Sequence, residues 1–173
     1  ALSLSAHKFG GPHGAGALLL RRGAAVSPLH HGGGHERGMR SGTIAAPLAA
    51  GMAAALREAT AQRDAEHARI DSLRSMLVDG VRGMHGVRLA GHRALRLPGI
   101  VSLLIDDCDS EALLMLLDRA GVACSTGSAC DAGVGRPSHV LQAMGVAERS
   151  GAGSAARASL RLSLGHSSSA SDI

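Results

Sequence analysis

Two short runs rich in apolar residues open the chain and enclose a glycine-rich turn. The runs occupy residues 1–5 and 15–20, and Gly10, Gly11 and Gly14 lie between them. Short apolar runs bounded by turn residues are typical of buried strands. We therefore predict two buried strands joined by a tight loop.

A long stretch with helical spacing follows, from about residue 45 to residue 83. Its apolar positions are Leu48, Met52, Ala55, Leu56, Ile70, Leu73, Leu77 and Val81. Arginine and glutamate occupy many of the intervening positions, as on the solvent side of an amphipathic helix. The spacing predicts one long helix, or two in series, despite Gly51.

The remainder of the chain alternates between strand and helix patterns. We predict strands over 87–90, 100–105 and 160–164, a helix that Asp109 caps and that ends before Gly121, and a short helix over 137–144. This order predicts a compact α/β unit after about residue 85, preceded by an incomplete piece of a larger unit. Because the chain starts without Met inside a predicted strand, we expect a fragment.

Composition narrows the class of protein. The chain of 173 residues is 45% hydrophobic and 18% charged, with Phe9 as its one aromatic residue. Stacking on nucleic-acid bases is therefore almost unavailable. The net charge of +4 is spread over single and paired arginines, which favours an acidic protein partner at least as much as nucleic acid. We expect no direct nucleic-acid partner.

Cellular location is indicated by two further features. No apolar run reaches the length of a membrane span, so we expect no membrane association. The three cysteines, Cys108, Cys124 and Cys130, form an odd set, which favours reduced thiols in the cytoplasm.

Lys8 is the only lysine, whereas the other seventeen basic residues are arginine. A primary amine condenses with a carbonyl, which a guanidinium does not do. On an extended segment the side chains of Ser5 and His7 would project to the same side and both donate to one phosphate. An amine beside phosphate donors suits pyridoxal 5′-phosphate. The alternative is a solvated surface lysine beside a turn.

Cys130 lies in a run of small and hydroxyl-bearing residues, 123–133, with glycines on both sides. A structural cysteine normally has large apolar neighbours, whereas an accessible thiol on a loop suits a nucleophile. Cys124 and Cys108 are the weaker candidates. Arg161 interrupts an apolar strand pattern, and a guanidinium there is costly to bury without an anion, so it is a candidate for binding a carboxylate. The alternative is a structural or surface arginine.

Histidines are frequent, and His30, His31 and His35 form the densest cluster. There is no Cys-x-x-Cys pair and no convincing pair of histidines at helical spacing. We therefore expect no metal site.

Several motifs, in order, resemble those of one enzyme family. They are Ser5-Ala6-His7-Lys8 with Gly11-Pro12-His13-Gly14, the segment His31 to Thr43, Ser125-Thr126-Gly127-Ser128-Ala129-Cys130, Pro137-Ser138-His139-Val140-Leu141, and Arg161-Leu162-Ser163-Leu164-Gly165. Together they resemble the cysteine desulfurases of the NifS/IscS type, which are class V aminotransferases with the pyridoxal-phosphate transferase fold of type I. The resemblance implies a partial fold of this type.

Roles for single residues follow from that resemblance. It implies that Lys8 binds pyridoxal 5′-phosphate covalently, and that Ser5 and His7 hold its phosphate. It also implies that Thr43 reaches the phosphate of the neighbouring subunit in a homodimer. Arg161 would bind the carboxylate of L-cysteine, and Cys130 would take the sulfur as a persulfide. His13, where a lysine is common in the family, is expected to play no part in the chemistry.

The resemblance also implies domains and partners. Residues 1–45 would be a remnant of the large cofactor-binding domain, 46–84 a connecting helix region, and 85–173 the small α/β domain with the cysteine loop. The sulfur acceptor would be an iron-sulfur scaffold or a tRNA-thiolation protein. Two alternatives remain: a truncated, non-catalytic relative that dimerises or docks sulfur acceptors, and a selenocysteine lyase.

Overall fold

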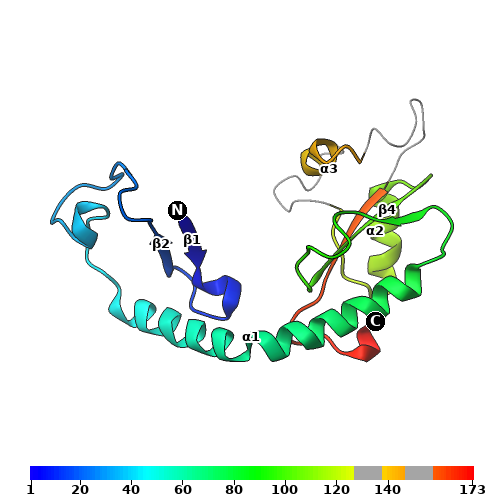
Figure 1. The fold of residues 1–173 in the computed structure, drawn as a ribbon, viewed down its shortest axis with the longest axis horizontal. Helices are drawn as coiled ribbons and strands as arrows, with labels where there is room; N and C mark the ends of the chain where they lie inside the picture. Colours follow the sequence, from blue (N-terminus) through cyan, green and yellow to red (C-terminus); the bar gives the residue numbers. More distant parts are fainter. Residues whose placement is uncertain (127–137, 147–157) are drawn as a thin grey trace. The chain divides into compact units, whose positions relative to one another are not determined.

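A computed structural model describes residues 1–126, 138–146 and 158–173 of the chain. The chain forms two compact units, Ala1–Asp64 and Ala65–Ile173. The long helix α1 (Ala46–Val81) runs from the first unit into the second. It confirms the predicted helix over 45–83 as one uninterrupted element (Figure 1).

The first unit contains a two-stranded antiparallel sheet. Strands β1 (Leu2–Ser5) and β2 (Gly16–Leu19) pair so that Leu2 faces Leu19 and Ser5 faces Gly16. The short 3-10 helix η1 (Ala6–Phe9) follows β1, and a second one, η2 (Glu36–Gly38), lies in the next loop.

Burial of these two strands was predicted wrongly. Leu2, Leu18 and Leu19 are each at least half exposed, at 57%, 53% and 50%. An apolar run indicates that a strand can be buried, but it does not show whether another element packs on that strand. A two-stranded ribbon has two faces to cover, and these three leucines stay exposed in this unit.

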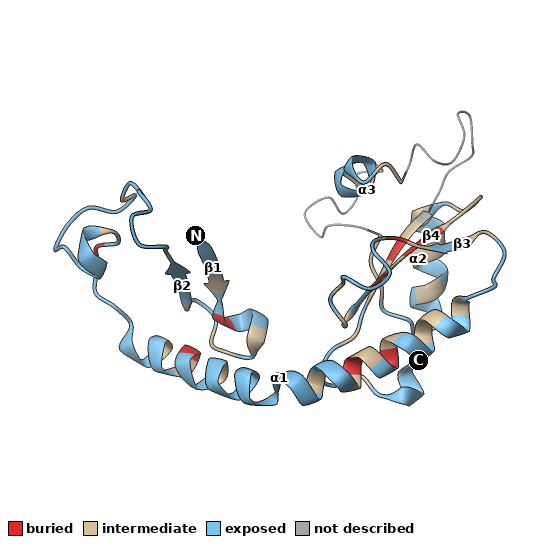
Figure 2. Cartoon of the chain, in the orientation of Figure 1, coloured by how far each residue is buried: buried red, intermediate tan, exposed pale blue. Residues whose placement is uncertain are grey.

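The second unit contains a three-stranded antiparallel sheet in the order β3, β4, β5. Its strands are β3 (Val87–Leu89), β4 (Ile100–Ile105) and β5 (Ala158–Ser163), close to the predicted positions. Val101, Leu103 and Leu160 are buried at its centre. Leu77, Val78 and Val81 from the second half of α1 pack against them, so the predicted apolar face of the helix contributes to the core (Figure 2).

Among its described residues, the second unit also contains three short helices. They are α2 (Ser110–Arg119), α3 (His139–Ala143) and η5 (Ala170–Asp172). Asp109 Oδ1 accepts hydrogen bonds from the backbone N–H groups of Glu111 and Ala112, which confirms the predicted cap of α2. Ser138 caps α3, whereas Pro137, which was expected to start that helix, lies outside the described residues. Among the helices of the described residues, none is long and apolar enough to span a membrane.

Candidate functional site

Lys8 lies in a tight turn between two paired strands. The backbone N–H groups of Gly10 and Gly11 both donate to the Ala6 carbonyl, and Ala6 N–H donates to the Ala15 carbonyl at 3.0 Å. Gly10 has a φ of 84°, a left-handed conformation that glycine adopts without steric cost. These bonds close the turn around Ala6, whose side chain is completely buried.

Gly11 approaches the chain too closely for any side chain. A Cβ atom at this position would lie 2.8 Å from the Ala6 Cβ and 3.1 Å from the Ala6 carbonyl oxygen. The glycine therefore allows the turn to fold back on its own first residue. This packing fixes the backbone that presents Lys8.

The expected alternation of Ser5 and His7 along an extended segment is wrong. Strand β1 ends at Ser5, and His7 belongs to η1. The chain leaves the extended conformation after Ser5 because the Ala6 carbonyl is used by the 3-10 turn. Ser5, His7 and Lys8 are all exposed, and they lie on the strand end and the 3-10 turn instead of on one strand face.

His13 lies against one of the candidate site residues. Its ring stacks on the ring of His7, with centroids 5.2 Å apart and an interplanar angle of 5°. His7 is one of the residues expected to hold the cofactor phosphate, so the position where a lysine is common in the family contacts a candidate binding residue. His13, which is expected from the sequence to play no part in the chemistry, thus lies against a residue that is expected to take part in it.

The Lys8 amine is accessible. Within the described part of the chain, its side chain makes no hydrogen bond and no ion pair. An amine with this freedom can react with a carbonyl group that the turn binds.

The segment leading to Thr43 is compact despite its glycines. Ser41 is buried, its N–H donates to the His30 carbonyl at 3.3 Å, and a Cβ on Gly32 would lie 3.3 Å from the Ser41 Cβ. Thr43 itself is exposed. Among the described residues no hydrogen bond joins Thr43 to Ser5, His7 or Lys8, and no group of three or more metal-binding side chains is found.

Arg161 belongs to the second unit, on strand β5. It faces Ser102 of β4 on one side and forms an isolated antiparallel bridge with Ser125 on the other. Its Nη2 lies 3.5 Å from the Ser125 Oγ, and within the described ranges its guanidinium has no carboxylate partner. Leu160 is buried, so alternation along the strand turns Arg161 to the opposite face.

Ser159 is an anchoring residue that sequence reasoning missed. Its Oγ donates to the Thr126 carbonyl at 2.9 Å, and its N–H donates to the Ser110 Oγ at 3.3 Å. Both contacts span more than thirty residues of sequence. In the sequence, Ser159 stands out only as a hydroxyl residue two positions before Arg161. That position does not show that its hydroxyl bonds to the Thr126 carbonyl.

Two of the three cysteines lie among the described residues. Cys130 lies outside the described residues. Cys124 packs against the core, and its partial burial, together with the negative charge of Asp118, raises the pKa of its thiol. Cys108 follows β4 and, like Cys124, is a free thiol. A raised pKa lowers the thiolate fraction of Cys124, which makes this residue a weaker nucleophile.

Comparison with known proteins decides the family. The aminotransferase class-V family matches residues 1–173. This chain belongs to that family. Among similar class-V proteins, an IscS-like cysteine desulfurase of Mycobacterium tuberculosis is 51% identical over 175 residues, covering 100% of this chain and 43% of that protein. A cysteine desulfurase IscS of Methanosarcina thermophila is 40% identical over 172 residues, covering 99% of this chain and 41% of that protein.

Solved structures of class-V relatives support the same conclusion. A NifS-like protein has a TM-score of 0.79 with 35% identity, covering 98% of this chain and 42% of that one. A NifS-like protein from Rickettsia africae has a TM-score of 0.80 with 28% identity, covering 98% of this chain and 43% of that one. The chain thus spans less than half the length of these relatives and has part of the type I transferase fold. The predicted resemblance to the NifS/IscS type is confirmed.

Proposed function

We propose that the protein to which this chain belongs is a pyridoxal-phosphate-dependent cysteine desulfurase. It would remove sulfur from L-cysteine, giving L-alanine and a persulfide on Cys130. The observation that carries the proposal is the single lysine of a class-V chain, presented by the closed turn that Ala6, Gly10 and Gly11 build.

The residues around Lys8 fit the proposed cofactor. Lys8 would hold it covalently through the amine, and Ser5 and His7 would donate hydrogen bonds to its phosphate. The side chains of Ser5, His7 and Lys8 are exposed and so accessible to such a group. The close packing at Gly11 fixes the backbone that carries them. When bound, the cofactor supplies an electron sink for the substrate carbon. Lys8 would then move the α-proton of the substrate as a general base and acid.

Sulfur transfer would use the second unit. Arg161, which has no acidic partner among the described residues, would bind the substrate carboxylate. The Cys130 sulfur would attack the sulfur of the substrate. The S–S bond forms as the C–S bond breaks, and the electron pair left on carbon takes a proton. Cysteine carbon is reduced, the two sulfurs are oxidised, and no external oxidant is needed.

The wider setting is also part of the proposal. Likeness to the family suggests a homodimer in which Thr43 reaches the phosphate bound by the neighbouring subunit. It also suggests an iron-sulfur scaffold or a tRNA-thiolation protein as the sulfur acceptor, and a cytoplasmic location. A selenocysteine lyase differs only in the chalcogen removed. A non-catalytic docking module would retain the fold without turnover.

The proposal is tested with a matched pair of cysteine variants in the full-length protein. Cys130→Ser should abolish persulfide formation from L-cysteine, measured by mass spectrometry, whereas Cys124→Ser should retain it. The cofactor absorbance should be unchanged in both variants. Wild-type sulfide release by Cys130→Ser would refute the catalytic assignment. A faster reaction with selenocysteine than with cysteine would favour the lyase.

A further inference from the structure

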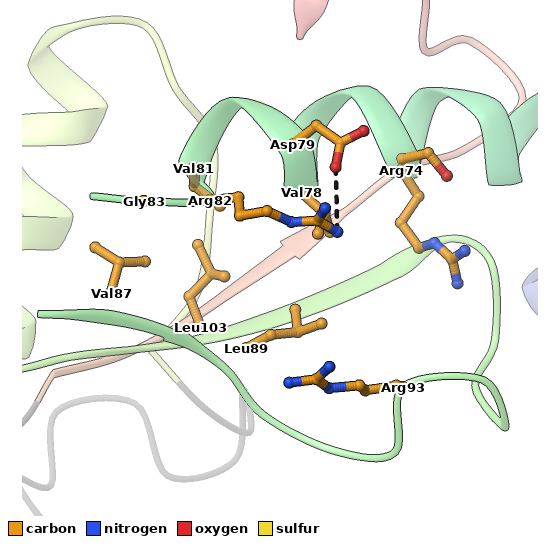
Figure 3. Close-up of a pocket in the computed structure, with 11 residues that line it drawn as sticks. Arg74, Val78, Asp79, Val81, Arg82, Gly83, Val87, Leu89, Arg93 and Leu103 are labelled. Atoms are coloured by element: carbon orange, nitrogen blue, oxygen red, sulfur yellow. Dashed lines mark ion pairs between the residues drawn. The ribbon is translucent and has the colours of Figure 1, made fainter. Parts of the chain in front are cut away.

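An open pocket of about 760 Å³ lies on the second unit. Arg161 is not one of its lining residues. Its walls come from the second half of α1, from β3 and β4, and from the chain after β3 (Figure 3). Aliphatic side chains form its floor: Val78, Val81, Val87, Leu89 and Leu103.

Arginines surround this floor. Arg74 reaches it from α1, Arg82 from the residue directly after α1, and Arg93 from the chain after β3 (Figure 3). Arg74 is paired with Asp71 at 2.6 Å, and Arg82 with Asp79 at 3.3 Å. Arg93 has no ion pair among the described residues. The pocket therefore carries positive charge that the described side chains do not balance.

A neighbouring arginine strengthens this imbalance. The Nη2 atom of Arg96 is buried and has no hydrogen-bond partner in the described part of the chain. Partial burial lowers the pKa of Arg96, and the positive charge of Arg74 lowers it further. A buried guanidinium nitrogen without an acceptor is costly, and a second guanidinium nearby adds repulsion. An anion bound beside Arg74 would reduce the repulsion between the two guanidinium groups.

The shape and lining select among anions. A single inorganic ion would fill a small part of a pocket this large and would leave the aliphatic floor uncovered. A nucleotide would find no aromatic ring among the lining residues on which to stack its base. A peptide that carries both an aliphatic side chain and carboxylates matches the floor and the arginines together.

We propose that this pocket is a docking site for an acidic peptide segment of a partner protein. An aliphatic side chain of that segment would cover Val78 and Leu89, and its carboxylates would pair with Arg74 and Arg93. This inference is independent of the desulfurase proposal, because it uses none of the residues assigned to catalysis.

The test measures peptide binding to the full-length protein by fluorescence anisotropy. The probe is a labelled peptide of alternating glutamate and leucine, and its glutamine analogue is the uncharged comparison. Arg93→Glu should raise the Kd of the acidic peptide by about tenfold or more, because it reverses a charge at the contact. Arg93→Ala should raise it less. Arg57→Glu, an equal charge change at an exposed position of α1, should leave Kd within about twofold.

Four results would overturn the proposal. Equal weakening by Arg57→Glu would mean that only the overall charge attracts the peptide. Equal binding of the glutamine analogue would remove the role of the carboxylates. Displacement of the peptide by inorganic phosphate at the same concentration would indicate a small-anion site. No binding to the wild-type protein would mean that another part of its own chain covers the pocket. Arg93 is exposed in a loop, so both of its variants should fold.

Discussion

Ser125 and Arg161 exchange two backbone hydrogen bonds, from Ser125 N–H to the Arg161 carbonyl at 3.0 Å and from Arg161 N–H to the Ser125 carbonyl at 2.6 Å. The candidate carboxylate-binding residue is therefore paired directly with the segment that leads to Cys130. Ser159 adds a third bond two residues earlier on β5, to the Thr126 carbonyl. The same strand thus holds Arg161 and the start of that segment.

Ser159→Ala should slow persulfide formation on Cys130. The variant loses the hydrogen bond to the Thr126 carbonyl, and one such bond is worth about 1 kcal/mol, or about fivefold in rate. The KM for cysteine should stay unchanged, because Arg161 keeps its place on β5. Single-turnover kinetics with mass spectrometry measure both quantities.

Ser159→Thr is the matched control for that variant, since it keeps the hydroxyl donor. It should form the persulfide at nearly the wild-type rate. If the alanine and threonine variants slow the reaction equally, the hydrogen bond to Thr126 has no functional role.

Gly11→Ala should destabilise the Lys8 turn by about 1–3 kcal/mol, the usual cost of overpacking. The new Cβ would be 2.8 Å from the Ala6 Cβ and close to backbone atoms, which cannot rotate away. Gly80→Ala is the control: it lies in α1 with open space around it, so it should stabilise the protein by about 0.5–1 kcal/mol. Chemical denaturation compares the two. Equal stability of both variants would contradict the close packing at Gly11.

Lys8→Arg should eliminate the visible absorbance of bound pyridoxal phosphate while keeping a positive charge. A guanidinium does not condense with the cofactor aldehyde. In the wild-type protein, borohydride reduction should attach the cofactor to the peptide that contains Lys8, identified by mass spectrometry. Attachment to a different lysine of the full-length protein would show that Lys8 has been misassigned.

The contact between Arg69 and Glu66 should make stability depend on pH in the acid range. The side-chain hydrogen bonds from Arg69, at 2.8 and 2.7 Å, lower the pKa of Glu66. A carboxyl whose pKa is lower in the folded state contributes stability above its ordinary pKa, and this contribution is lost as pH falls through the lowered value. The wild type should therefore lose stability as the solution is acidified below the ordinary glutamate range.

Arg69→Met isolates that contribution. Without the guanidinium, the pKa of Glu66 should return toward its ordinary value, and the pH dependence of the melting temperature should become shallower. Arg69 also donates to the carbonyls of Gly165, His166 and Ser168, so the variant should be less stable at neutral pH as well. A pH profile parallel to that of the wild type would exclude Glu66 as the titrating group.

Local patterns predicted the elements well for clear physical reasons. Apolar positions at helical spacing gave α1 within two residues of its observed ends, Ala46 and Val81. Asp109 before Glu111 gave the cap of α2, because a cap bonds to backbone only two and three residues away. Failures occurred where the outcome depended on distant neighbours. The burial of β1 and β2 was wrong, and the stack of His13 on His7 was not foreseen.

The sequence by itself determined the order of strands and helices, the family, and the presence of one lysine in a glycine-rich turn. Each of these depends on the chemistry of single residues or on spacing within a few positions. Tertiary structure alone decided that Ser125 pairs with Arg161, that Ser159 holds Thr126, and that Arg74 and Arg93 surround one pocket. Such contacts join residues far apart in the chain, and they form only when folding brings particular surfaces together.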